Sequence, residues 1–232
     1  MDTNDYINKY IQLEKTVRET YNLNKSDSIS YYLSRKDKFR KFRHDIQYCQ
    51  EVRNWLQHNE KINKDFAITP NDVMIDFIDS LIERIKSRSK CPDICIKVND
   101  VYYQNIDGNI QTTIKVMRKN CFTHIPILKD NIVVGIFDEN SVFNYIADNI
   151  IVMIDQKLKF SDIKQYLSID DRKMESFVFM PYDSYVEELE DLIEIEFKKG
   201  KRIGMALLTS DGNKASPLMG IITPWDIIQS ER

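Results

Sequence analysis

Two helix starts in the carboxyl-terminal half of the chain carry residues that could bind a phosphorylated ligand. The segment 220–228 reads GIITPWDII, an apolar strand that runs into a helix. Thr223 is expected at the N-cap and Asp226 at the third helical position, where a hydroxyl and a carboxylate are favoured. Unpaired helix N–H groups suit a phosphate, and a carboxylate can accept hydrogen bonds from both ribose hydroxyls. The alternative is an ordinary helix start, in which both residues serve only as caps.

The same motif occurs 85 residues earlier with its chemistry exchanged. The segment 135–141 reads GIFDENS, which places Asp138 where the hydroxyl belongs and Ser141 where the carboxylate belongs. Two such helix starts, each directly after a similar apolar strand, indicate an internal repeat. The exchange predicts two unequal sites, and we expect a bound nucleotide at Thr223 and Asp226 rather than at the earlier motif.

Two further side chains lie close to these motifs in the chain. Arg202 and its neighbour Lys201 stand just before a strand of the second repeat, where they could bring positive charge near a phosphate. His124 begins a strand of the first repeat. We expect His124 either to satisfy its hydrogen bonds at the strand edge or to contact a phosphate.

A separate group of residues in the first third of the chain could cleave RNA. Arg53, Asn54 and His58 occur in the sequence RNWLQH. On a helix Asn54 and His58 share a face, and the long Arg53 side chain can swing to the same place. His58 could move the proton of a ribose 2′-hydroxyl, Arg53 could stabilise charge on the phosphorane, and Asn54 could orient either.

No metal ion or other cofactor is needed for such a reaction, and the cysteines do not predict a metal site. Cys91 and Cys95 are spaced as a pair, but no second pair of Cys or His completes a tetrahedral set. We therefore expect all four cysteines to be free thiols, most of them buried.

A basic stretch lies just before Arg53. Residues 35–43 read RKDKFRKFR, with Phe39 and Phe42 among six basic side chains. Such a stretch could hold an RNA backbone and stack its bases. The alternative is a solvated helix face with two aromatic residues anchored in the core.

The spacing of apolar residues divides the chain into a helical front and a mixed rear. Helices are expected over 6–22, 29–34, 39–58 and 69–85, the last opened by TPND. After residue 92, alternation and β-branched residues predict hairpins of strands 124–128 with 132–137 and 203–208 with 218–222. Helices are expected over 138–147 and 184–199 and from residue 223. The predicted fold class is α+β multidomain, an all-α bundle followed by a repeated α/β pair.

The order of helix, hairpin and GII-T-x-x-D-I over about residues 93–232 resembles the CBS domain. The resemblance implies a tandem pair, with the first repeat at 93–152 and a linker segment with the second repeat at 153–232. The pair is expected to bind an adenine nucleotide such as AMP, ADP or ATP between the repeats as a regulatory ligand. In that family the Thr and Asp of the last motif contact ribose and phosphate. Thr223 and Asp226 match these positions, and Asp138, Ser141, His124 and Arg202 complete the expected nucleotide-binding set.

The arrangement Arg-Asn-x-x-x-His in a four-helix bundle over residues 1–90 is similar to the HEPN superfamily. The similarity implies a metal-independent ribonuclease with RNA as substrate and a site shared across a homodimer. Glu60 stands where some members carry a modifiable Tyr, so no such modification is expected.

The bulk composition suits a globular protein of 232 residues, 42% of them hydrophobic. The start of the chain has no signal-peptide pattern and no apolar run is long enough for a membrane span, so we expect a cytoplasmic protein without membrane contact. Two functions fit the residues. One is a nucleotide-responsive CBS pair that controls a HEPN-like ribonuclease; the other is a non-catalytic nucleotide sensor whose helical domain serves dimerisation or partner binding.

Overall fold

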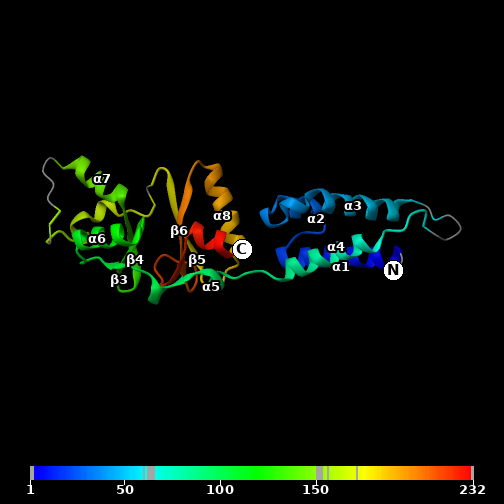
Figure 1. The fold of residues 1–232 in the computed structure, drawn as a ribbon, viewed down its shortest axis with the longest axis horizontal. Helices are drawn as coiled ribbons and strands as arrows, with labels where there is room; N and C mark the ends of the chain where they lie inside the picture. Colours follow the sequence, from blue (N-terminus) through cyan, green and yellow to red (C-terminus); the bar gives the residue numbers. More distant parts are fainter. Residues whose placement is uncertain are drawn as a thin grey trace. The chain divides into compact units, whose positions relative to one another are not determined.

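A computed structural model describes residues 3–59, 61, 66–149, 154–155, 157–170 and 172–230. The chain divides into two compact units, Met1–Arg88 and Ser89–Arg232. The first unit is helical and the second mixes helices with strands (Figure 1). The predicted combination of α and β structure is therefore confirmed.

The helical unit contains α1 (Thr3–Tyr21), α2 (Ile29–Arg35), α3 (Arg43–His58) and α4 (Asp72–Lys86). The third helix was expected from Phe39, but residues Asp37–Phe42 form a 3₁₀ helix and α3 begins only at Arg43. Side chains three residues apart lie on the same side of a 3₁₀ helix. That geometry directs both Phe39, which is fully buried, and Phe42, which packs on Phe77, toward the core.

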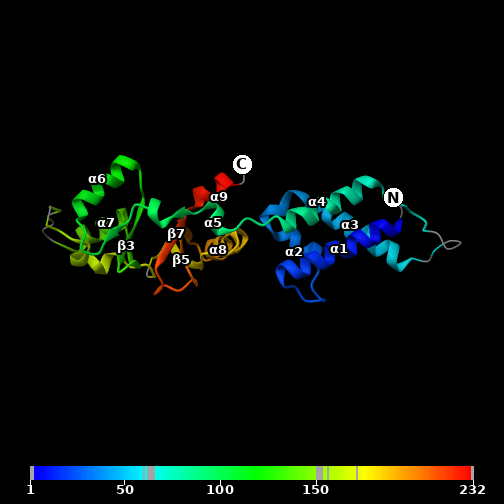
Figure 2. The same cartoon turned by 90° about the horizontal axis from the view of Figure 1, so that it is seen from below.

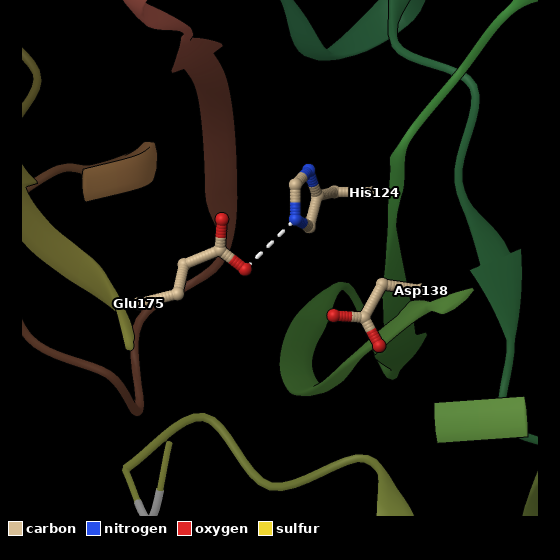
Figure 3. Close-up of side chains that lie close together, drawn as sticks. All are labelled: His124, Asp138 and Glu175. Carbon is tan, nitrogen blue, oxygen red and sulfur yellow. Dashed lines mark hydrogen bonds and ion pairs between the residues drawn. The ribbon is translucent and has the colours of Figure 1, made fainter. Parts of the chain in front are cut away.

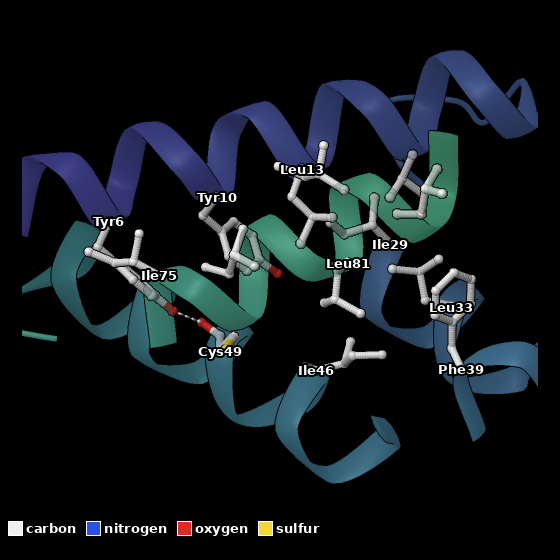
Figure 4. Packing of buried hydrophobic residues seen from close by; sticks show 14 of the residues in the cluster. Tyr6, Tyr10, Leu13, Ile29, Leu33, Phe39, Ile46, Cys49, Ile75 and Leu81 are labelled. Atoms are coloured by element: carbon white, nitrogen blue, oxygen red, sulfur yellow. Dashed lines mark hydrogen bonds between the residues drawn. The ribbon is translucent and has the colours of Figure 1, made fainter. Parts of the chain in front are cut away.

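The core of this unit is made by one face of each helix. The buried residues of α1 recur at spacings of three or four. Those of α4, which lies beside it (Figure 2), recur every three residues, with Leu81 and Ile82 adjacent. Tyr6 is buried but donates a hydrogen bond of 2.7 Å from its hydroxyl to the carbonyl of Cys49 on α3 (Figure 4). Each buried Leu or Ile stabilises the packing by roughly 1.5–3 kcal/mol relative to exposure.

The second unit contains two sheets. Strands β1 (Ile96–Lys97), β7 (Leu218–Ile222), β6 (Arg202–Thr209) and β5 (Glu175–Pro181) are neighbours in that order in the larger sheet. Strands β2 (Gln104–Asn105), β3 (His124–Lys129) and β4 (Ile132–Asp138) form the smaller one. Although β1 precedes the first repeat's hairpin in the sequence, it pairs with β7 of the second repeat.

The α-helices of this unit are α5 (Cys91–Ile94), α6 (Ile110–Asn120), α7 (Glu139–Asp148), α8 (Val186–Lys198) and α9 (Pro224–Ser230). Short 3₁₀ helices, η2 and η3, cover Val98–Asp100 and Phe160–Tyr166. Of the described helices, none combines the length and the apolar character that a membrane span requires.

The two predicted hairpins are present and match each other in detail. In the first, Ile127 faces Gly135 and the register shifts at the next pair; in the second, Leu208 faces Gly220 and the register shifts at the same place. Each hairpin leads directly into a helix, α7 or α9. The internal repeat therefore includes the irregularity in strand register, a β-bulge, at the same place in both hairpins.

The sheets of the two repeats pack on each other through a shared apolar cluster. It combines residues of β4 with residues of β5, β6 and β7, namely Val133, Ile136, Phe177, Met205, Leu207, Leu218 and Ile221, together with Val101 and Leu128. Helices cover the outer sides, where α6 and η3 pack against the smaller sheet and α5, α8 and α9 against the larger one. This packing fixes the two repeats against each other.

Candidate functional site

A cavity of about 460 Å³ opens where the two repeats meet. Its apolar wall comes from both repeats and includes Ile96, Val101, Ile203, Met205 and Ile221. Its polar lining includes Asp100, Thr123, His124, Glu175, Arg202 and Thr223. The volume falls in the range of about 300–1,000 Å³ that is usual for small-molecule sites. Three of the residues predicted for nucleotide binding, His124, Arg202 and Thr223, thus line one cavity.

Asp226 caps the start of α9, whereas the hydroxyl of Thr223, which was expected to accept from a helix N–H, donates to Asp226 instead. The Asp226 carboxylate accepts hydrogen bonds of 2.7 Å from both the backbone N–H and the hydroxyl of Thr223. Thr223 lines the cavity, whereas Asp226 lies behind it. A ligand that bonds to the Thr223 hydroxyl therefore meets an oxygen already polarised by a carboxylate.

Asp138 and Ser141 form the same cap in reverse order at the start of α7. Ser141 donates its backbone N–H to Asp138 at 2.8 Å, and Asp138 donates its own N–H to the Ser141 hydroxyl at 3.3 Å. The exchange found in the sequence preserves the cap, because a carboxylate can serve from either end of the first turn. Both side chains are buried and neither lines the cavity of the second repeat.

Arg172 forms an ion pair with the buried Asp138. One terminal amino group of Arg172 bonds to the Asp138 carboxylate, the other donates to the carbonyl of Ile136 at 2.7 Å, and Nε donates to the carbonyl of Ser168 at 2.8 Å. The guanidinium also lies 4.9 Å from the ring centre of Phe177. The guanidinium of Arg172 therefore occupies the polar groups around Asp138 in the first repeat.

His124 connects the two repeats. Its Nε2 lies 2.9 Å from Oε2 of Glu175, on β5, and its Nδ1 lies 2.8 Å from the Thr123 hydroxyl. The other Glu175 oxygen accepts a hydrogen bond of 3.1 Å from Nε of Arg202. Both ring nitrogens of His124 thus have partners within the protein.

The environment of Glu175 favours its charged form. Burial by itself would raise the pKa of this carboxyl, but the hydrogen bond from His124 and the positive charges of Arg202 and Arg172 hold the pKa below its usual range. Glu175 is only 6% exposed. The carboxylate is therefore a fixed negative charge on the cavity wall.

Gly204 makes room for that carboxylate. A Cβ atom at this position of β6 would lie 2.8 Å from Cδ of Glu175 and 2.9 Å from the ring of Phe177. Both distances are shorter than van der Waals contact. A side chain here would displace Glu175 from His124 and Arg202.

His124, Asp138 and Glu175 also lie close enough to hold a metal ion, since their ligand atoms are within 4.8 Å of one another (Figure 3). Arg172 and Arg202 already pair with the two carboxylates, however. A divalent cation would have to displace both guanidinium groups or add two charges to a balanced cluster. The donor set therefore fits an ion-pair network better than a metal centre.

Sequence reasoning did not identify Glu175, Arg172 or Gly204. The signal for Glu175 was a charged residue at the head of the apolar segment ESFVFMP, which forms β5. Strand β5 itself and helix α6 were not predicted. Lys201, which was considered together with Arg202, does not line the cavity.

In the helical unit, Arg53 is held against α1. Its Nη2 lies 3.3 Å from Oε1 of Glu14, its guanidinium carbon lies 5.8 Å from the ring centre of Tyr10, and its Nη1 donates to Asn54 at 3.1 Å. His58 is the last residue of α3 and is exposed, and no hydrogen bond or ion pair joins it to another described residue. The structure thus brings Arg53 and Asn54 together and leaves His58 open to solvent.

The basic stretch before α3 uses its aromatic residues in the core. Phe39 is fully buried, and Phe42 packs against Phe77 with ring centres 5.9 Å apart. Phe39 is therefore not available to stack on a base, and the partly buried Phe42 already packs on a ring of the protein. The alternative, a solvated face with two core anchors, fits these positions.

No family model matches the chain, and no curated protein sequence matches it. Among solved structures, CbpB in complex with c-di-AMP is similar, with 15% identity, a TM-score of 0.49 and coverage of 66% of this chain and 92% of CbpB. A CBS domain-containing protein from Bacillus anthracis has 13% identity, a TM-score of 0.44 and coverage of 64% and 96%. A CBS domain pair in complex with 5′-methylthioadenosine and S-adenosyl-L-methionine has 16% identity, a TM-score of 0.41 and coverage of 62% and 96%.

Proposed function

We propose that residues 89–232 form a CBS-type pair that binds an adenine nucleotide as a regulatory ligand in the cavity between the repeats. One observation carries the proposal: a single cavity joins Thr223 and Arg202 with an apolar wall built from both repeats. An apolar wall suits a base, and a hydroxyl and a guanidinium suit ribose and phosphate. The resemblance of the Thr223 motif to the family pattern supports adenine as the base.

The residues divide into two roles. Ile203 and Ile221 offer apolar contact to the base, while the Thr223 hydroxyl and the Arg202 guanidinium offer polar contacts. Asp226 orients the Thr223 hydroxyl through its hydrogen bond. His124 positions Glu175 and is bonded on both ring nitrogens, so its contribution is to the shape of the cavity.

The first repeat's motif is expected to stay empty of nucleotide. Arg172 already bonds to Asp138 and to the carbonyl of Ile136, so two acceptors that ribose hydroxyls would use there are occupied. We therefore propose one nucleotide per chain, at the second repeat's motif.

Isothermal titration calorimetry with AMP, ADP and ATP tests the proposal. Thr223→Val removes the hydroxyl with little change of volume, and we expect it to weaken binding roughly tenfold. Thr112→Val is the matched control, because Thr112 lies at the start of α6 and outside the cavity. Heat changes that are absent for all three nucleotides with the folded parent protein would refute nucleotide binding.

For the helical unit we propose, as a second candidate, a metal-independent ribonuclease in which His58 moves protons and Arg53 and Asn54 act on the phosphate. The observation that favours it is an exposed imidazole one turn beyond a hydrogen-bonded Arg53–Asn54 pair. A homodimer would bring His58 of one copy toward Arg53 of another. The competing candidate is a non-catalytic unit for dimerisation or partner binding, in which Arg53 serves the fold through Glu14 and Tyr10.

A cleavage assay separates these candidates. Single-stranded RNA is incubated with the protein in EDTA, and His58→Ala is compared with His44→Ala, an exposed histidine near the start of the same helix. The ribonuclease candidate requires cleavage by the parent and His44→Ala proteins and a loss of about 100-fold or more in His58→Ala. Cleavage that survives His58→Ala, or no cleavage by a demonstrated dimer, favours the non-catalytic unit.

A further inference from the structure

We infer that this cavity selects a nucleotide carrying at most one phosphate group, so that AMP is preferred to ADP and ATP. The inference rests on the proposed function and adds to it the class of ligand. It follows from the charges of the described residues around the cavity and from which of their donors remain free.

The first observation is that Arg202 is the one Lys or Arg side chain among the described residues that line the cavity. Its Nε is bonded to Glu175, but the side chain is 75% exposed. Neither of its terminal amino groups makes a hydrogen bond to another described residue. These two groups form a planar fork that matches two oxygens of a single phosphate.

The second observation is that His124 does not add a second free cationic donor. Nε2 is held by Glu175 and Nδ1 lies against the Thr123 hydroxyl. Among the described residues that line the cavity, Arg202 therefore remains the one cationic side chain with free donors, and these suit a single phosphate.

The third observation is the excess of carboxylates. Asp100 and Glu175 line the cavity, and Asp226 stands directly behind Thr223. Glu175 is paired with Arg202 and lies near Arg172, so the negative charge left without a cationic partner among these residues is that of Asp100 and Asp226. Each further phosphate adds negative charge, and these two carboxylates repel it.

The test is a titration of the full chain with adenosine, AMP, ADP and ATP in EDTA. We expect AMP to bind most tightly and ATP to bind at least roughly tenfold more weakly. Adenosine should also bind more weakly than AMP, since it leaves the Arg202 fork unused. Arg202→Ala should abolish the advantage of AMP over adenosine, and Lys201→Ala, the adjacent residue outside the cavity lining, should preserve it.

A charge variant tests the repulsion directly. Asp100→Asn should narrow the difference between AMP and ATP roughly threefold, and Asp107→Asn, an exposed change outside the cavity lining, should leave that difference unchanged. ATP binding as tight as AMP, or a preference that ignores both Arg202 and Asp100, overturns the inference but leaves nucleotide binding standing. No heat from any of the four ligands overturns the proposed function itself.

Discussion

Arg172 illustrates how a single residue decides which of two similar motifs is available to a ligand. Each of the three guanidinium nitrogens of Arg172 donates a hydrogen bond to another group of the protein. Its charged partner, the side chain of Asp138, is only 3% exposed. The sequence shows the exchange of Asp138 and Ser141 and predicts unequal sites. It does not show the cause, because Arg172 comes from a connecting segment with no periodic pattern.

Removing the positive charge of Arg172 should destabilise the second unit. Arg172→Met leaves the buried Asp138 carboxylate without its partner, and we expect the unfolding free energy of the second unit to fall by roughly 3–5 kcal/mol. Urea denaturation measures it. Lys214→Met is the control, since its partner Asp170 is 69% exposed, and such an exposed pair contributes less than about 1 kcal/mol. Equal losses in the two variants would show that Arg172 is no more than a surface partner.

Glu175 should make the stability of the second unit depend on acid pH. Its folded-state pKa lies below the ordinary value of about 4.5, because His124 and the arginines outweigh the effect of burial. The stabilisation is therefore present above pH 4.5 and is lost as the pH falls through the lower folded-state pKa. Glu175→Gln should flatten this part of the pH profile measured by thermal unfolding. Glu139→Gln, an exposed change, should leave the profile as steep as in the parent.

At the scale of elements, periodic apolar spacing was a reliable guide. The helices of the first unit and both hairpins were predicted because each buries one face against the rest of its unit. Helix α6 was missed, since its buried residues Ile110, Thr113 and Met117 include a polar side chain. Strand β5 was missed because it begins with the charged Glu175. Glu175 pairs with His124 and Arg202 in the candidate site. The charged residue that the site requires therefore interrupts the apolar pattern by which the strand would have been recognised.

The cap of α6 gives a prediction at this scale. Asn109 accepts a hydrogen bond of 2.8 Å from the N–H of Thr112, and its amide group also donates to the carbonyls of Leu158 and Asp155 at 3.3 and 3.4 Å. The corresponding cap of α4, Asn71, is exposed, and among the residues that the structure describes it accepts from the N–H of Met74. We expect Asn71→Ala to cost about 1 kcal/mol and Asn109→Ala about 2 kcal/mol.

An aspartate at the same position separates the two functions of Asn109. Asn109→Asp keeps the oxygen that caps α6 and removes the amide donors, so its loss of stability should lie between those of the parent and Asn109→Ala. Chemical denaturation provides the measurement. A loss in Asn109→Asp as large as in Asn109→Ala would mean that the cap itself contributes nothing.

For the whole molecule, the question is whether the nucleotide unit communicates with the helical unit. Each unit has its own apolar core and the candidate cavity lies entirely within Ser89–Arg232. The sequence predicted a boundary near residue 90 from the change of period, but the coupling between the units depends on contacts that no periodicity encodes. By linkage, nucleotide binding changes the stability of the first unit only where the contacts between the units differ in free energy between the bound and the free state.

Scanning calorimetry of the full chain can measure that coupling. We expect two transitions, because the units have separate cores. Leu33→Ala should lower one and Leu207→Ala the other, since both side chains are fully buried and such changes cost roughly 2–5 kcal/mol. At 100 times its dissociation constant AMP should stabilise the second unit by about 2.7 kcal/mol. If nucleotide binding is coupled to the stability of the helical unit, the transition lowered by Leu33→Ala should move as well. A shift confined to the other transition would show that AMP does not change the stability of the helical unit.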